Sequence, residues 1–189
     1  MNAEAAREAL FGDSLACEET RPAAFAVGCL DLAAAKMASA RAEGLLRALA
    51  IVEDSRIDDT EDHGAGDLAL HRIEAKVDLL MTMMATLSQG SDRHDPARAV
   101  RWSAIGACLQ SAGEVAPGTQ GIFRIQPSDW LPESLVLPAT VLNHSSEGAG
   151  GESLLWLRFG ALAPNLQSEL ERHLFRVHRR AIAEQRRPR

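Results

Sequence analysis

The histidine side chains are the residues of this sequence best suited to act as a catalytic base, because the pKa of imidazole lies near neutrality. The six histidines are scattered, with His71, His173 and His178 in stretches of helical spacing. There is no nucleophile elbow, phosphate-binding loop, HExxH pair or cysteine pair that would bring a base and a nucleophile together. We therefore predict that the chain is not an enzyme.

An acidic stretch is the one place where ligands for a metal ion stand close together in the sequence. Residues Glu53 to Asp62 (EDSRIDDTED) are rich in carboxylates, and His63 follows them. Their spacing matches no set of metal ligands, so a solvated connector is the simpler interpretation. We predict no bound metal and no cofactor.

The C-terminal stretch from Arg172 to Arg189 is rich in arginine and could contact phosphate or nucleic acid. The formal net charge of the chain is −6 at pH 7, which argues against attraction to nucleic acid or membranes. The helix macrodipole offers another explanation, because acids favour the start of a helix and bases its end. On that interpretation Glu169 and Glu171 lie near the start, with Arg176, Arg179 and Arg180 near the end. We predict no DNA partner.

The N-terminus and the cysteines indicate the compartment. MNAEAAREALFG has no basic start, and no long apolar run occurs in the chain, so we expect neither a signal peptide nor a membrane span. The three cysteines, Cys17, Cys29 and Cys108, lie far apart and are odd in number, which favours small buried residues in a reducing compartment. We expect a cytoplasmic protein.

The residues that would position any site include one heptad stretch, LHRIEAKVDLLMTMMATL. Its apolar residues recur at steps of three and four, the seam of a coiled coil. They are Leu70, Ile73, Val77, Leu80, Met84 and Leu87.

The composition of this seam bears on the number of strands in the coil. Leu70 and Ile73 at the first a and d positions favour four strands, whereas Val77 with Leu80 favours two. Apolar Met81 and Met83 widen the seam, and no asparagine specifies a dimer. We predict a homo-oligomer, a tetramer through parallel heptad helices, and the alternative is a core helix of a monomer.

The rest of the chain alternates between helical and strand spacing. Helices are predicted over 3–11, from Asp31 to Glu53 and from Asn165 to Gln185. Strands are predicted over 21–30, as a strand–turn–strand over 99–109, over 121–125, over 134–142 with a bulge or edge at Pro138, and over 153–159. Short strands at this spacing suggest a small barrel or sandwich.

From Arg101 onward the chain resembles the PilZ domain, which binds the bacterial second messenger cyclic di-GMP. The shared features are short strands, a Ser-x-x-Gly turn, a strand ending in LRFGAL and a helix near Asn165. The turn is present as Ser103 and Gly106, but Arg101 stands where the family has an acid or amide. Arg21 marks the place of the family's Arg-x-x-x-Arg pair, and Phe25 stands four residues on.

The heptad stretch and LERHLFRVHRRAIAEQRR resemble helices of a noncanonical PilZ subgroup with a helical insertion. This resemblance implies an α+β fold: a small antiparallel PilZ-like β-barrel interrupted by two long helices, a C-terminal helix and a coiled-coil assembly. The segments would be 1–30 with the first barrel strand, 31–89 as the inserted helical hairpin, 96–162 as the remaining barrel and 163–189 as the last helix and basic tail.

The departures from the PilZ motif predict weak or absent binding of cyclic di-GMP. Losing one arginine fork costs about 1.5–3 kcal/mol, so losing two would take a micromolar ligand to the millimolar range. Arg101 could supply a phosphate contact or be an exposed strand residue. Trp102 could stack on a base or pack on the barrel. The resemblance implies a regulatory protein of motility or virulence with a signalling-protein partner; the alternatives are a direct receptor with a rearranged site and a pure oligomeric scaffold.

Overall fold

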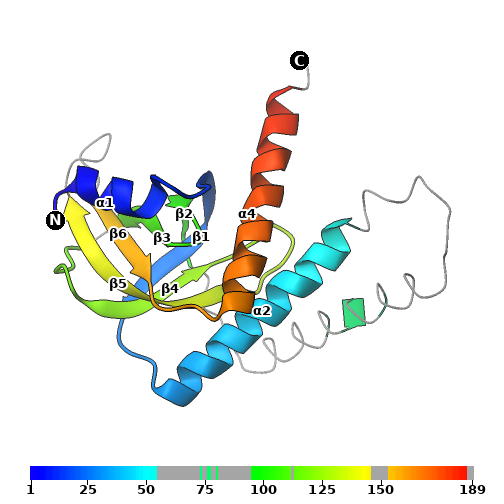
Figure 1. Cartoon of the computed structure of the whole chain (residues 1–189), viewed down its shortest axis with the longest axis horizontal. Helices are drawn as coiled ribbons and strands as arrows, with labels where there is room; N and C mark the ends of the chain where they lie inside the picture. Colours follow the sequence, from blue (N-terminus) through cyan, green and yellow to red (C-terminus); the bar gives the residue numbers. More distant parts are fainter. Residues whose placement is uncertain are drawn as a thin grey trace.

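The computed structural model describes residues 1–54, 73, 76–77, 80, 95–111, 113–145 and 153–186. Six antiparallel strands close into a barrel in the order β1-β2-β3-β6-β5-β4 (Figure 1). The strands are β1 (Cys17–Val27), β2 (Ala97–Trp102), β3 (Gly106–Ser111), β4 (Gln120–Ile125), β5 (Leu135–Ser145) and β6 (Ser153–Phe159). The helices are α1 (Ala3–Phe11), α2 (Leu32–Asp54) and α4 (Pro164–Gln185). The predicted α+β barrel with a C-terminal helix is confirmed.

Strand β1 closes the barrel by pairing on both sides. Its first half, Cys17 to Pro22, pairs with β2, and its second half, Ala23 to Val27, pairs with β4. Residues 28–96 therefore leave and re-enter the barrel between two strands that are neighbours in space. The helix α2 that begins this insertion packs on β5 and on α4.

Helix α1 covers one side of the barrel and begins at a side-chain cap. The Asn2 Oδ1 atom accepts a hydrogen bond of 2.8 Å from the Ala5 N–H, which satisfies one of the free donors at the helix start. Ala6, Leu10 and Phe11 are buried and belong to a small core with Cys108 and Trp156. The predicted helix over 3–11 is confirmed.

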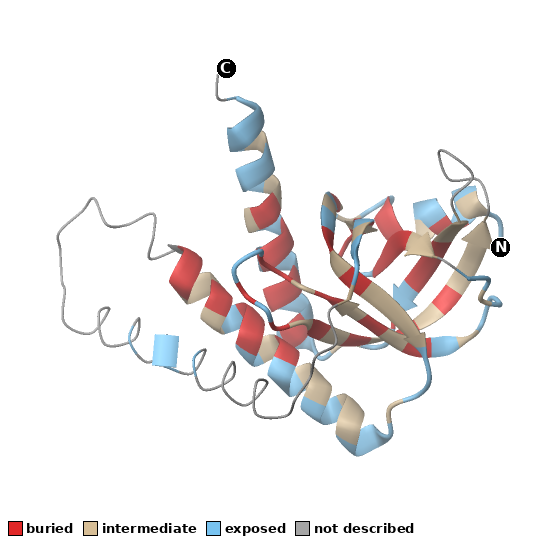
Figure 2. Ribbon diagram, turned by 180° about the vertical axis from the view of Figure 1, so that it is seen from behind, coloured by how far each residue is buried: buried red, intermediate tan, exposed pale blue. Residues whose placement is uncertain are grey.

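The main core lies inside the barrel and under α2 and α4 (Figure 2). Asp31 caps α2, because its Oδ1 atom accepts a hydrogen bond of 2.7 Å from the Ala34 N–H. The apolar face of α2 is buried only in its second half, where Ala42 to Val52 joins the core. This face meets the apolar residues of α4, which are Leu166, Leu170, Leu174 and Val177.

The first strand differs from its sequence prediction. The prediction placed the strand over residues 21–30, where Phe25, Val27 and Cys29 recur at every second position. The strand instead begins at Cys17, Val27 is exposed, and Cys29 is exposed beyond the strand. Gly28 explains the early end, since its φ of 152° lies in a region that favours glycine. The prediction that all three cysteines are buried was therefore wrong for Cys29.

Of the predicted bulge or edge at Pro138, the bulge was wrong, whereas on the β6 side Pro138 does lie at an edge of the ladder. Pro138 pairs in continuous register with Ile122 of β4, and the irregularity of β5 lies between Val141 and Asn143. The Pro138 carbonyl accepts a hydrogen bond of 2.8 Å from the Gly160 N–H, just past the end of β6. Because N and C=O of one strand residue face the same side, the missing N–H of Pro138 faces a place with no β6 ladder partner.

Helix α4 covers the predicted residues and begins one residue earlier, at Pro164. Its buried face ends at Val177 and leaves Ala181 exposed, because the last turns extend beyond the barrel (Figure 1). Its first turn carries no acid and its last turn no base. The macrodipole explanation of its arginines was therefore wrong, since that effect is confined to the terminal turns.

Candidate functional site

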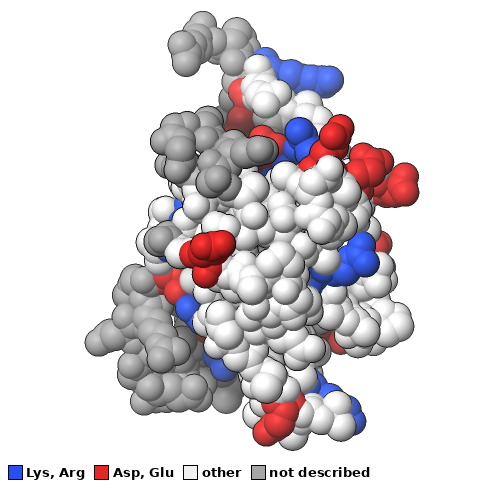
Figure 3. Space-filling view, turned by 90° about the vertical axis from the view of Figure 1, so that its left-hand side faces the viewer, with Lys and Arg blue, Asp and Glu red and all other residues white. Residues whose placement is uncertain are grey.

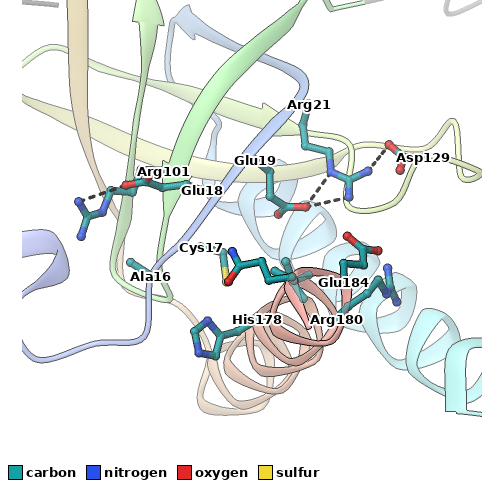
Figure 4. Close-up of a pocket in the computed structure, with 13 residues that line it drawn as sticks. Ala16, Cys17, Glu18, Glu19, Arg21, Arg101, Asp129, His178, Arg180 and Glu184 are labelled. Carbon is teal, nitrogen blue, oxygen red and sulfur yellow. Dashed lines mark hydrogen bonds and ion pairs between the residues drawn. The ribbon is translucent and has the colours of Figure 1, made fainter. Parts of the chain in front are cut away.

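A polar pocket of about 470 Å³ lies between the start of β1 and the second half of α4 (Figure 4). It brings together both arginines of the degenerate nucleotide motif, Arg21 from β1 and Arg101 from β2. The other charged groups that line it are Glu18, Glu19, Asp129, His178, Arg180 and Glu184.

Arg21 is buried and its guanidinium group is occupied by carboxylates. Its Nε and NH2 atoms donate to Glu19 Oε2 at 2.9 and 2.8 Å, and its NH1 atom pairs with Asp129 Oδ1. Glu19 and Arg21 lie on the same face of β1 because side chains two residues apart share a face. Burial by itself lowers the pKa of Arg21, but the hydrogen bond and charge of Glu19, with those of Asp129, raise it above the ordinary value. Arg21 therefore stays charged and already has anionic partners.

Glu19 connects the pocket to the core. Its Oε1 atom accepts a hydrogen bond of 3.0 Å from Trp102 Nε1. The Trp102 side chain is fully buried, and its ring centroid lies 5.7 Å from that of His173 on α4. Trp102 therefore packs between the barrel and α4, and its ring is not available to stack on a base.

His173, on the buried face of α4, has no hydrogen-bond partner at either ring nitrogen among the described residues. It is 1% exposed. Burial, followed by the positive charges of Arg176, Arg21 and Arg180, lowers the pKa of His173 to about 3. The imidazole is therefore neutral and acts as a packing group rather than a base.

Arg101 is also engaged, although less tightly than Arg21. Its NH1 atom lies 3.3 Å from Glu18 Oε1, and its guanidinium carbon lies 4.7 Å from the centroid of the Phe11 ring. The expectation of an exposed strand residue was wrong, because the Arg101 side chain is 29% exposed and is covered by α1.

The Ser-x-x-Gly turn uses its polar atoms to hold α1. Ser103 Oγ donates to the Leu10 carbonyl at 2.8 Å and accepts from the N–H groups of Ile105 at 3.1 Å and Gly106 at 3.3 Å. A Cβ atom at Gly106 would overlap the Leu157 carbonyl oxygen and lie 2.6 Å from Leu10 Cδ2. Both motif residues thus meet the needs of the turn and of the packing of α1, whether or not a nucleotide binds.

The charges of the pocket are close to balance. Three arginines (Arg21, Arg101 and Arg180) face four carboxylates (Glu18, Glu19, Asp129 and Glu184). Arg180 is drawn toward α2, because its NH2 atom lies 3.0 Å from the buried Glu53 Oε1. An anionic ligand would therefore have to displace carboxylates that already hold the arginines.

The two buried thiols near this pocket are held in their protonated form. Burial, followed by the charge of Glu19, raises the pKa of the Cys17 thiol to about 11, and its Sγ atom donates to the Leu174 carbonyl. Burial likewise raises the pKa of Cys108 to about 12. Within the described ranges, no three His, Cys, Asp or Glu residues are grouped as metal ligands would be. His63 and His71 lie outside those ranges.

Three of the six heptad residues can be assessed. Ile73, Val77 and Leu80 are helical and are 58%, 46% and 58% exposed. The spacing of four and three places them on one face of a helix. Leu70, Met84 and Leu87 lie outside the described residues.

Sequence reasoning missed the groups that neutralise the arginines. Glu19 lies two residues before Arg21, just outside the predicted strand 21–30, so only a strand that began earlier would have placed it beside Arg21. Asp129 and Arg180 come from a loop and from the last helix, so only the fold brings them to Arg21.

No helix among the described residues is long and apolar enough to span a membrane.

Comparison with known proteins agrees with this barrel. Residues 46–187 match the family model of the atypical PilZ domain, cyclic di-GMP receptor, so the match starts within α2 and leaves out β1. No curated protein matches the chain.

One solved structure gives the same assignment. A pathogenic protein from Xanthomonas campestris, a new tetrameric PilZ domain self-assembled via an unusual helical bundle, is 44% identical. The match covers 96% of this chain and 97% of that chain, with a TM-score of 0.76. The PilZ domain with c-di-GMP of YcgR from Escherichia coli is 16% identical over 50% of this chain and 82% of that one, with a TM-score of 0.40. By its family match and its barrel, the chain belongs to the atypical PilZ family.

Proposed function

We propose that this chain is a regulatory protein of cyclic di-GMP signalling that binds the nucleotide weakly or not at all and acts through protein contacts. The observation that carries the first part is the occupied guanidinium of Arg21, held by Glu19 and Asp129. Arg101 is paired with Glu18, and Trp102 is buried. Control of motility or virulence from the cytoplasm is the setting that the family resemblance implies.

The second part of the proposal is self-assembly through the heptad helix, as a parallel tetramer. Ile73, Val77 and Leu80 expose apolar side chains at coiled-coil spacing. The similar Xanthomonas campestris protein is a tetramer self-assembled via a helical bundle. Together these observations favour a tetramer over a monomer that buries the heptad residues internally.

A calorimetric titration tests the first part. Cyclic di-GMP titrated into the purified chain should give no saturable heat up to high micromolar ligand. Saturable binding below about 10 µM would instead establish a direct receptor with a rearranged site. The double variant Glu19→Gln, Asp129→Asn frees Arg21 from charged partners and should bind more tightly than the wild type.

Light scattering tests the second part. Ile73→Asn with Leu80→Asn should reduce the mass from that of a tetramer to that of a monomer, because buried amides without partners disfavour the seam. Lys76→Gln, an exposed change on the same helix, is the matched control. An unchanged mass in the double variant removes the coiled-coil hypothesis. A tetramer that binds neither the nucleotide nor a pathway protein would be a pure scaffold.

A further inference from the structure

The outward face of α4 carries a stripe of alternating basic and apolar residues. Its members are separated by three, four, three and four positions, so they form one line along the helix. They are Arg172, Phe175, Arg179, Ile182 and Arg186, and we call them the outer stripe. With 3.6 residues per turn, this line lies about 180° around α4 from the buried face.

The stripe is open to solvent in the described part of the molecule. Phe175 is 55% exposed, the Arg residues of the stripe are exposed, and Ile182 is half-buried. Helix α4 packs on α2 and β1 with its opposite face, and its last turns extend beyond the barrel (Figure 1). An exposed aromatic side chain flanked by arginines is a common composition for the centre of a protein interface.

The arginines of α4 divide into two groups by their partners. Arg176 and Arg180 lie 3.5 and 3.0 Å from the buried carboxylate of Glu53. Arg179 has no carboxylate at ion-pair distance among the described residues, and its guanidinium lies 6.0 Å from the Phe175 ring centroid. Within the outer stripe, Arg172 is paired with Glu169, whereas Arg179 keeps a positive charge that no described carboxylate neutralises.

The carboxylates of α4 do not lie on this stripe. Glu169 is buried and pairs with Arg172 at 3.2 Å, and Glu184 faces the pocket on the other side. Glu171 lies at the margin of the stripe and accepts a hydrogen bond of 3.3 Å from Gln167. The surface is thus selectively basic on a chain whose net charge is −6.

We propose that the outer stripe is a docking surface for an acidic amphipathic helix of a partner protein. Heptad spacing suits a helix, the arginines call for carboxylates, and Phe175 with Ile182 calls for an apolar line between them. This proposal names the chemistry of the partner through which the protein would act. It rests on the proposed function in one respect, that the protein acts through protein contacts.

Other occupants fit the stripe less well. A second copy would present the same arginines, and like charges oppose such a contact. Nucleic acid is disfavoured by the net charge of the chain. A membrane would need a broad apolar face, and the broad apolar face of α4 is already buried on the barrel.

A matched pair of synthetic peptides tests the proposal by fluorescence anisotropy. Each has about three heptads with Leu at every d position, and the probe carries Glu at every a position where its control carries Lys. The Glu peptide should bind the intact wild-type assembly saturably, and the Lys peptide should not. Arg179→Glu should weaken binding of the Glu peptide about tenfold, and Phe175→Ala by a similar factor.

A charge-matched variant separates docking from general attraction. Lys36→Glu changes the net charge as much as Arg179→Glu does, and Lys36 is exposed on α2, away from the stripe. It should leave the affinity within about twofold. Equal weakening by Lys36→Glu and Arg179→Glu, or no saturable binding to the wild type, overturns the proposal.

Two further readouts keep the outcomes distinct. Light scattering should show the same mass for Arg179→Glu as for the wild type, so failure of the docking proposal differs from failure of the assembly proposal. Co-sedimentation with vesicles of phosphatidylserine and phosphatidylcholine should show no binding. Vesicle binding that Arg179→Glu removes would assign the stripe to an anionic lipid surface and overturn the helix proposal.

Discussion

The two faces of α4 carry arginines in opposite circumstances. On the inner side, Arg180 lies beside a pocket in which Arg21 is held by Glu19 and Asp129. On the outer side, the guanidinium of Arg179 lies 6.0 Å from the centroid of the Phe175 ring, at the limit of a cation–π contact. The charge of Arg21 is neutralised within the fold, whereas that of Arg179 has no carboxylate partner among the described residues. An arginine at a family's ligand position is therefore weak evidence for a ligand until its carboxylate partners have been identified.

The side of the molecule that carries α1 and β5 has few charged side chains (Figure 3). Figure 3 views the molecule from the α1 and β5 side, where uncharged side chains predominate and Lys and Arg are dispersed among Asp and Glu. No broad basic surface gathers on this face among the described residues.

The largest expected effect is on the free energy of unfolding, which should fall when the buried Arg21 is removed and hardly change when the exposed Arg179 is removed. Arg21→Ala leaves the carboxylate of Glu19, 12% exposed, without its charged partner, and should lower the free energy of unfolding by about 3–5 kcal/mol. Arg179→Ala removes an exposed side chain and should change it by less than about 0.5 kcal/mol. Urea unfolding at one protein concentration measures both, since assembly adds a concentration term. Similar losses in the two variants would break the comparison.

The pH dependence of stability sharpens the view of the inner side. The pKa of His173 is lowered to about 3 when folded, so below about pH 6.5 the unfolded chain binds a proton there that the folded chain does not. The contribution of His173 is fully present above pH 6.5 and is lost as pH falls toward 3, by about 2 kcal/mol at pH 5. His173→Phe should remove this part of the slope in urea unfolding at pH 7, 6 and 5. An identical slope in variant and wild type would mean that His173 is protonated in the fold.

A smaller effect is expected at the Ser-x-x-Gly turn. Ser103→Ala removes the hydrogen bond to the buried Leu10 carbonyl and should cost about 1–2 kcal/mol of unfolding free energy. Ser168→Ala, at an exposed position of α4, should stay within about 0.5 kcal/mol. A Ser103→Ala variant as stable as the wild type would show that the serine is not required by the fold, and its role in a ligand site would have to be reconsidered.

Much of the fold could be predicted because local signals agreed. Asp31 precedes a helical pattern and caps α2, and SLLWLRF forms β6 over the predicted residues. The errors arose where a single local signal was followed alone. The alternation that includes Val27 and Cys29 suggested a longer strand, but the strand ends before Gly28. At Pro138 a bulge was considered, whereas the missing N–H is tolerated because Pro138 lies past the end of β6.

The candidate site could be predicted in position but not in chemistry. Arg21 and Arg101 do meet at one pocket, as the family motif implies. Arg21 is neutralised by Glu19, two residues away on the same strand, and by Asp129 in a loop. The contact with Asp129 is so remote in the chain that sequence spacing does not indicate it. The role of the α4 arginines likewise depends on Glu53 of α2, which only packing brings near.

The position of the insertion between β1 and β2 has a consequence for folding. Strand β1 is synthesised early, but both strands that pair with it follow residue 96. Closing the barrel must therefore overcome the entropy of a long loop, which grows as the logarithm of the loop length. Helical contacts form in microseconds, and such remote strand pairing is slower. We expect chains to meet through their helices while β1 is still unpaired. At that stage a strand from one copy could complete the barrel of another, so crowded refolding should favour interlocked, strand-exchanged species over dilute refolding.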